Sequence, residues 1–98
     1  MAASFVLDLD IPSLLRKAGN LAATKLPKEV VEVTLEPQLD MLCIRFRKPK
    51  DGELGEPVHP QIHLFRDSRT NEITAVELTE MYQFLRKSLV SKRRYRPD

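Results

Sequence analysis

The sequence predicts an α+β fold in which a four-stranded antiparallel sheet, built of two hairpins, carries an N-terminal and a C-terminal helix on one face. Two patterns lead to this prediction. Apolar and polar residues alternate in short runs, as they do when one face of a strand is buried. Near each end of the chain, apolar residues instead recur at helical spacing, which is typical of an amphipathic helix.

Composition is that of one ordinary globular domain. Of the 98 residues, 42% are hydrophobic and 31% are charged, so the chain can bury a modest core without disulfides. We expect a single domain over residues 1–98 with flexible ends at 1–9 and 93–98, although the first segment also allows a short edge strand. Cys43 has no second cysteine to pair with, the start lacks the basic region of a signal peptide, and no run could span a membrane. These features predict a cytoplasmic protein without membrane contact.

The first helix is predicted to begin after Asp10. Its carboxylate can cap the first turn, and Pro12 suits that turn because the N–H that proline lacks would have no helical partner there. Two end points are open, since residues 19–20 (Gly-Asn) accept a left-handed cap, while the helix could also run to Lys25 before Pro27 stops it. The predicted apolar face consists of Ile11, Leu14, Leu15, Ala18, Leu21 and Ala22.

Four strands are predicted, at residues 30–36, 41–47, 61–66 and 72–78. The first two are joined by residues 37–40, a connection short enough for a hairpin. The last two are joined by residues 67–71, which are rich in side chains that bond their own backbone. Between the hairpins, residues 48–60 hold three of the seven prolines and two of the three glycines, so we expect a long polar loop there.

The predicted fourth strand, residues 72–78, has apolar side chains on both faces. Such a strand is either central in its sheet or paired with a second subunit. A sheet of four short strands also leaves apolar surface uncovered, so we expect a homodimer formed through this strand, the C-terminal helix or the N-terminal strand.

The last helix is predicted to begin at Thr79, which can cap it. Its end is basic: residues 86–98 carry six Lys or Arg against one acid, a net charge of +5, whereas residues 1–85 carry a net charge of −3. This end is a candidate nucleic-acid contact. The interpretations we favour are a solvated helix end that complements its own dipole, or a tail that docks on the acidic body of another subunit. The candidate contact residues are Arg86, Lys87, Lys92, Arg93, Arg94, Tyr95 and Arg96.

One stretch resembles a known family. Residues 35–44 (Leu-Glu-Pro-Gln-Leu-Asp-Met-Leu-Cys-Ile) are similar to the opening of a small uncharacterised prokaryotic family of unknown function, and residues 67–78 are similar to its Asp-rich turn and closing strand. The resemblance covers residues 33–80. It implies a small antiparallel sheet and, for some members, genes beside toxin-like partners, but no activity. The chain departs from the pattern at Leu35, Cys43, Asn71 and Ala75, where the family has aromatic residues or glycine.

Two aspartates lie beside predicted strands, where each could have either a catalytic or metal-binding role or a structural role in a turn. Asp40 and Asp67 lie in turns, and at the same end of a sheet they would form a carboxylate pair able to act as a general base or to bind a metal. We favour the alternative that each accepts backbone N–H groups within its own turn, because no third ligand is evident.

The remaining candidates also point away from catalysis. His59 and His63 have the spacing of helical zinc ligands, but Pro60 lies between them, and in an extended chain they would be about 13 Å apart. Cys43 lies within a strand pattern, which favours a packed side chain over a nucleophile. We therefore predict no catalytic residue, no cofactor and no metal.

Arg45 and Arg47 share one face of the second predicted strand. We favour cross-strand ion pairs with Glu32 and Glu36, and the alternative is a basic face that contacts an acidic partner. In order of preference, the sequence therefore suggests a regulatory or accessory protein acting through protein–protein contacts, a nucleic-acid-binding accessory protein, and a small metal- or ligand-dependent enzyme using the two aspartates and a histidine.

Overall fold

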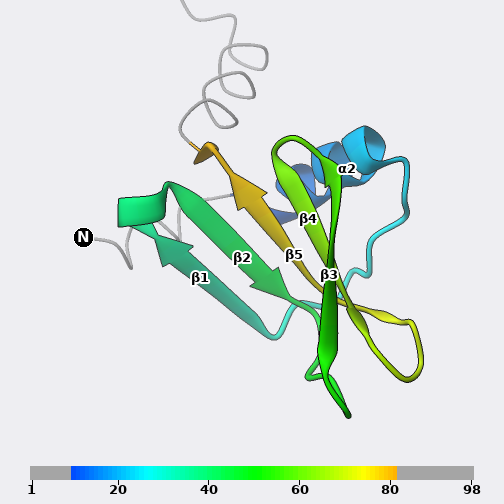
Figure 1. Ribbon diagram of the computed structural model, residues 1–98. Helices are drawn as coiled ribbons and strands as arrows, with labels where there is room; N and C mark the ends of the chain where they lie inside the picture. The colour runs from blue at the N-terminus through cyan, green and yellow to red at the C-terminus, as the bar shows by residue number, and fades with distance from the viewer. Residues whose placement is uncertain (1–9, 82–98) are drawn as a thin grey trace, which may run out of the picture.

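Five antiparallel strands form one sheet, and a helix covers one of its faces (Figure 1). The computed structural model describes residues 10–81. The helix runs across the strands, and the sheet has the order β1-β2-β5-β4-β3. The elements are α2 (Ile11–Ala22), β1 (Glu32–Glu36), β2 (Met41–Arg45), β3 (Glu53–His59), β4 (Ile62–Asp67) and β5 (Ile73–Thr79), with a short 3-10 turn at Pro37–Leu39.

The predicted four-stranded sheet is wrong, because β3 forms where a long loop was expected. This strand is an edge strand that pairs with β4 alone. An edge strand has one row of backbone groups without a ladder partner, so it tolerates Pro57. Glycine at position 55 is explained by packing, because a Cβ atom there would lie 3.0 Å from Cε2 of Phe65 on the neighbouring strand. The proline and the glycine break the alternation by which a strand is identified in a sequence.

The prediction of a C-terminal helix capped by Thr79 is wrong at its start. Thr79 ends β5, where its N–H donates to the carbonyl of Gln61 at 2.9 Å. Glu80 then adopts a left-handed conformation, with φ of 53°, and turns the chain out of the sheet. Within residues 10–81, α2 is the one α-helix of more than a single turn. Most of the predicted helix, and all of the basic residues from Arg86 onward, lie outside the described residues.

The start of α2 is as predicted. Asp10 caps it: Oδ1 accepts the N–H of Ser13 at 3.2 Å and Oδ2 accepts the Ser13 hydroxyl at 2.8 Å. Pro12 lies in the first turn. No helix within residues 10–81 is both long and apolar enough to cross a membrane.

The end of α2 differs from both predicted end points. The helix stops at Ala22, and Ala23 is left-handed with φ of 55°. The N–H of Thr24 donates to the Gly19 carbonyl at 2.9 Å and that of Ala23 to the Asn20 carbonyl at 3.2 Å, which is the Schellman arrangement. A Cβ atom at Gly19 would lie 2.8 Å from the carbonyl oxygen of Thr24. The glycine therefore allows the chain to fold back against the helix.

The core lies between α2 and the sheet. Leu14, Leu15 and Ala18 of the helix are buried against inward-facing residues of the central strands. The alternation predicted for the second strand is confirmed, since Leu42 and Ile44 are buried while their neighbours face the other side of the sheet. The other buried apolar residues of this core are Phe46, Ile62, Leu64, Val76, Leu78 and Met81.

The two predicted hairpins are confirmed as β1–β2 and β4–β5, but β5 is central. It pairs with β2 on one side and β4 on the other. This explains its apolar residues on both faces, with Ala75 and Val76 both fully buried. The alternative that this strand pairs with a second subunit is wrong. Residues 46–52 must therefore cross the end of the sheet, from the end of β2 to the far edge strand.

Candidate functional site

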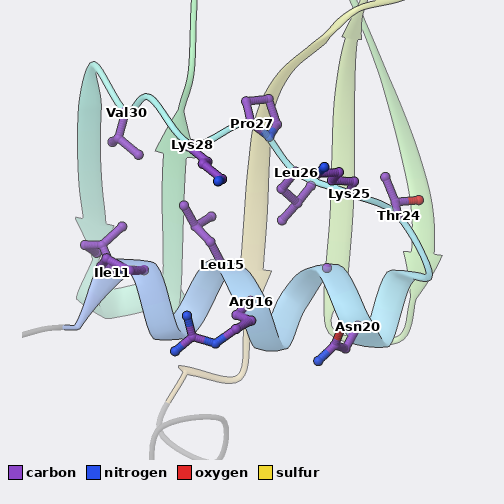
Figure 2. Close-up of a pocket in the computed structure, with 12 residues that line it drawn as sticks. Ile11, Leu15, Arg16, Asn20, Thr24, Lys25, Leu26, Pro27, Lys28 and Val30 are labelled. Carbon is purple, nitrogen blue, oxygen red and sulfur yellow. The ribbon is translucent and has the colours of Figure 1, made fainter.

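A groove runs along α2, between the helix and the connection that follows it (Figure 2). The turn at Ala23 brings residues 24–30 back beside the helix, and the space left between the two has a volume of about 780 Å³. We call this space the α2 groove. It is lined by Ile11, Pro12, Leu15, Arg16, Gly19, Asn20, Thr24, Lys25, Leu26, Pro27, Lys28 and Val30.

The floor of the α2 groove is aliphatic. Leu15 points up from the helix, and Leu26 and Val30 point down from the connection toward it (Figure 2). Ile11, Leu26 and Val30 are only partly buried against the core, while Leu15 is 9% exposed. These side chains therefore hold the connection onto the fold and still present apolar surface to an occupant of the groove.

The rim of the α2 groove is cationic. Arg16, Lys25 and Lys28 are all exposed, and no acidic residue lines the groove. Arg16 donates to the hydroxyl of Ser13 at 3.2 Å. Among the described residues, neither lysine forms an ion pair with an acid. Two acids flank the groove, Asp10 at the helix cap and Glu29 in the connection, so cations still predominate there.

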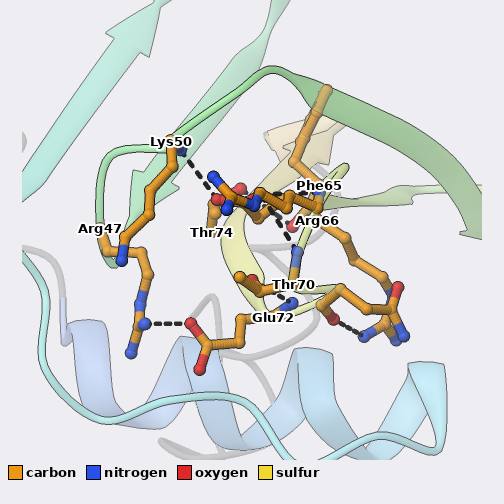
Figure 3. Close-up of polar contacts among 10 residues, drawn as sticks. Arg47, Lys50, Phe65, Arg66, Thr70, Glu72 and Thr74 are labelled. Atoms are coloured by element: carbon orange, nitrogen blue, oxygen red, sulfur yellow. Dashed lines mark hydrogen bonds and ion pairs between the residues drawn. The ribbon is translucent and has the colours of Figure 1, made fainter.

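A second group of polar residues lies at the end of the sheet where residues 46–52 cross from β2 to β3 (Figure 3). In this group each arginine of the sheet meets a carboxylate. We define the polar cluster as Arg45, Arg47, Glu53, Asp67, Glu72 and Thr74.

The centre of the polar cluster is Glu53. Arg45 donates to its carboxylate twice, at 2.8 and 3.3 Å, and the buried hydroxyl of Thr74 donates to the same group. The hydrogen bond from Arg45 lowers the pKa of Glu53 and raises that of the arginine, burial opposes both shifts, and the bond from Thr74 lowers the Glu53 pKa further. This contact joins the end of β2 to the start of β3 and so fixes the crossing segment.

The predicted partners of the two strand arginines are therefore wrong. Register places Arg45 opposite Glu32 of β1, yet its guanidinium pairs with Glu53, and Arg47 pairs with Glu72. Cross-strand geometry alone did not decide the pairing, because the crossing segment brings a carboxylate from the far edge within reach. Contact of the two arginines with an acidic partner stays a prediction.

Asp67 has the structural role favoured from the sequence. Its side chain is 3% exposed and accepts the N–H groups of Lys50 at 2.8 Å, Arg69 at 2.8 Å and Thr70 at 3.3 Å. These backbone donors, that of Lys50 first, lower the pKa of the carboxyl group. A carboxylate held in this way is a poor general base.

Asp40 lies at the other end of β5, so the two aspartates do not form a pair. Met41 is opposite Thr79, whereas Asp67 follows Arg66, which is opposite Ile73. Asp40 itself closes the β1–β2 connection in a left-handed conformation, with its N–H donating to the Pro37 carbonyl at 3.1 Å.

The two histidines and the cysteine belong to three different strands, β3, β4 and β2. His59 and His63 lie on paired strands rather than along one extended chain, and Nδ1 of His59 accepts the N–H of Gln61 at 3.1 Å. Residues 10–81 contain no group of three or more His, Cys, Asp or Glu side chains that could hold a metal ion. Burial raises the pKa of Cys43, with Arg45 opposing the shift and nearby glutamates adding to it, so its thiol stays protonated at neutral pH.

The α2 groove was missed in the sequence, although a signal was present. Leu26 and Pro27 lie between Lys25 and Lys28, and Val30 follows two residues later, in a segment too short and too broken for a helix. Such a mixture just after a helix is compatible with a chain that folds back and packs by one side only.

The resemblance over residues 33–80 was the pointer to relatives that the sequence offered. It stays a prediction. Comparison of the chain with known protein families, with curated proteins and with solved structures finds no match.

Proposed function

We propose that the protein is a cytoplasmic regulatory or accessory protein that acts by binding another protein, and that the α2 groove is the contact surface. The observation that carries the proposal is the combination of an aliphatic floor and a cationic rim without paired acids. Concave sites of this size with a few convergent polar groups are typical of binding surfaces.

Binding is preferred to catalysis because three side chains that could take part in chemistry are already engaged. Asp67 accepts three backbone N–H groups, Glu53 is paired with Arg45, and His59 closes its own hairpin. A general base or nucleophile needs a side chain that can reach a substrate with a suitable pKa, and these groups instead stabilise turns and strand ends.

Photo-crosslinking tests the proposal. A full-length chain with p-benzoylphenylalanine in place of Asn20, an exposed residue of the α2 groove, is irradiated in lysate of its source organism with and without nuclease. The matched control carries the same group in place of Ser68, which is exposed in the β4–β5 turn. We expect a discrete nuclease-resistant protein adduct from position 20 and none from position 68. Equal adducts at both positions, or none at position 20, would contradict the proposal.

A second candidate function is nucleic-acid binding by the basic end. The net charge of +5 over residues 86–98 favours it, although these residues lie outside the described part of the chain. Deleting residues 91–98 should then abolish retention of the protein on an oligonucleotide column, with a steep dependence on salt. Equal retention of the truncated and full-length chains would rule this candidate out.

The homodimer expected from the sequence also stays a prediction. In the described part of the chain, β1 and β3 are the edge strands, and Val31, Leu39 and Leu54, at or beside them, are each more than 60% exposed: 64%, 64% and 62%. These edges are the remaining strand surfaces for self-association. Sedimentation velocity over a range of protein concentrations measures it directly.

A further inference from the structure

We infer that the α2 groove takes a short linear segment of a partner protein in which carboxylate side chains are interleaved with aliphatic ones. This inference rests on the proposed function and adds the chemistry of the partner. It follows from the rim, the floor and the length of the α2 groove.

The rim selects the charge of the partner. Arg16, Lys25 and Lys28 surround the hollow, and the two lysines form no ion pair with any acid among residues 10–81. Elsewhere in the described residues the arginines of the sheet and its turns are matched by carboxylates, such as Arg69 by Asp51 at 3.1 Å. An acidic segment would supply to the α2 groove the counter-charges that the fold supplies to these arginines.

The floor selects a protein segment over a nucleic acid or a membrane. No aromatic residue lines the α2 groove, so bases would have no stacking surface. The apolar side chains are recessed between the helix and the connection (Figure 2), whereas a membrane-binding helix presents an apolar face outward. Recessed Leu, Ile, Val and Pro side chains are instead suited to aliphatic anchors.

The length limits the segment. The 12 residues of α2 span about 18 Å, which corresponds to about six residues of extended chain. Lys25 and Lys28 are at most about 10 Å apart along the backbone, so carboxylates two residues apart in an extended segment, about 7 Å from one another on the same face, could reach both lysines.

Fluorescence anisotropy with defined peptides tests the inference. The probe is a labelled peptide of about eight residues in which Asp or Glu alternates with Leu or Ile, long enough to fill the α2 groove. Matched peptides replace the acids with their amides, the acids with Lys, or the aliphatic residues with Ser. Each is titrated with the wild-type chain, with the Lys25→Glu/Lys28→Glu variant, and with the Lys48→Glu/Lys50→Glu control, which changes the charge equally at exposed lysines outside the groove. Thermal melts of the three proteins confirm that they are folded.

We expect the acidic aliphatic peptide to bind the wild type and the control alike, and the groove variant at least about tenfold more weakly. The Lys-containing peptide should show the reverse preference, since the charges are exchanged. Binding of the acidic peptide should weaken as salt is raised.

Several results would overturn the inference. Equal binding of the amide and acidic peptides, or no binding of any peptide, would refute the inference that the partner segment is acidic. The proposed function would still stand in that case if position 20 gave a protein crosslink. Lysine-dependent binding of an oligonucleotide or of phosphatidylglycerol vesicles, stronger than that of the acidic peptide, would reassign the α2 groove to that ligand. If a chain lacking residues 1–9 bound the peptide far more tightly than the full chain, the occupant would be the chain's own first segment.

Discussion

The α2 groove and the polar cluster both contain cations, but the two regions use them differently. In the polar cluster, Arg45 and Arg47 are matched by Glu53 and Glu72 from within the chain. In the groove, Lys25 and Lys28 have no acid paired with them in the described residues. The difference indicates that charge in the cluster stabilises the fold, whereas charge in the groove is available to another molecule. The following predictions test that division, starting with the largest effect.

Acid should have the largest effect, because it removes several cluster carboxylates at once. The pKa values of Glu53 and Asp67 lie below their ordinary values of 4.5 and 3.8 in the folded protein. A lowered folded-state pKa contributes stability that is complete above the ordinary value and is lost as the pH falls through the folded value. The urea midpoint should therefore begin to fall as the pH drops below about 5, and should continue to fall through the lowered pKa values of the two carboxyl groups.

Asp67→Asn is the matched test of this pH dependence. The variant should be less stable at neutral pH and should lose less stability on acidification, because it has no charge to lose. Asp51→Asn, on the exposed surface nearby, is the control. If the free energy of unfolding of Asp67→Asn depended on pH as steeply as that of the wild type, protonation of Asp67 would not contribute to the pH dependence of stability.

Glu53→Ala should destabilise the protein by about 2 kcal/mol, because it leaves Arg45 and the buried Thr74 hydroxyl without this acceptor. The Arg45 and Glu53 side chains are 24% and 19% exposed, so they are only partly screened by solvent. Urea denaturation measures the effect. Glu56→Ala is the control, since that carboxylate is 58% exposed and 3.6 Å from Arg66, and we expect it to cost less than about 0.5 kcal/mol. Equal losses would mean that the cluster contributes no more than a surface pair.

Ala23→Gly should stabilise the protein by about 0.5 kcal/mol, because glycine adopts the left-handed conformation without the penalty of a Cβ atom. The increase in the free energy of unfolding measures the conformational strain at Ala23, in the turn that forms the α2 groove. Ala22→Gly, one residue earlier and within the helix, should instead destabilise. Thermal or urea unfolding distinguishes the two, and a loss in both variants would show that the turn at Ala23 carries no strain.

Lys25→Ala with Lys28→Ala should have the smallest effect on stability, within about 0.5 kcal/mol of the wild type, because both side chains are exposed and unpaired with acids of the described residues. The same variant should bind the acidic aliphatic peptide more weakly. A loss of peptide binding without a loss of stability would distinguish the lysines of the α2 groove from the charged residues of the polar cluster. A stability loss comparable with that of Glu53→Ala would mean that the groove lysines also serve the fold.

Local features of the fold were readable from the sequence where a single element determines its own pattern. Asp10 is a cap because of its position before an apolar stripe, and β2 is identified as a strand because Leu42 and Ile44 alternate with Cys43 and Arg45. β3 could not be read in this way. As an exposed edge strand it needs no alternation, and Gly55 is explained only by Phe65 on the neighbouring strand.

The candidate site depended on tertiary contacts that the sequence does not display. The α2 groove exists because Ala23 adopts a left-handed conformation and Thr24 approaches Gly19 closely. Alanine has no intrinsic preference for that conformation, so the turn is imposed by packing of the following residues. Arg45 likewise finds its carboxylate through the segment that crosses the sheet, and no cross-strand rule predicts that partner.

The central position of β5 has a consequence for how the chain reaches its native state. Within the described residues, β1–β2, β3–β4 and β4–β5 each join strands that are consecutive in sequence, and β2–β5 is the pairing that does not. Closing the long loop between Arg45 and Ala75 has an entropic cost that no local turn offsets. We therefore expect the β1–β2 hairpin and the β3–β4–β5 meander to form first and to dock along this seam late in folding, so that substitutions within either unit slow folding while those at the seam mainly speed unfolding.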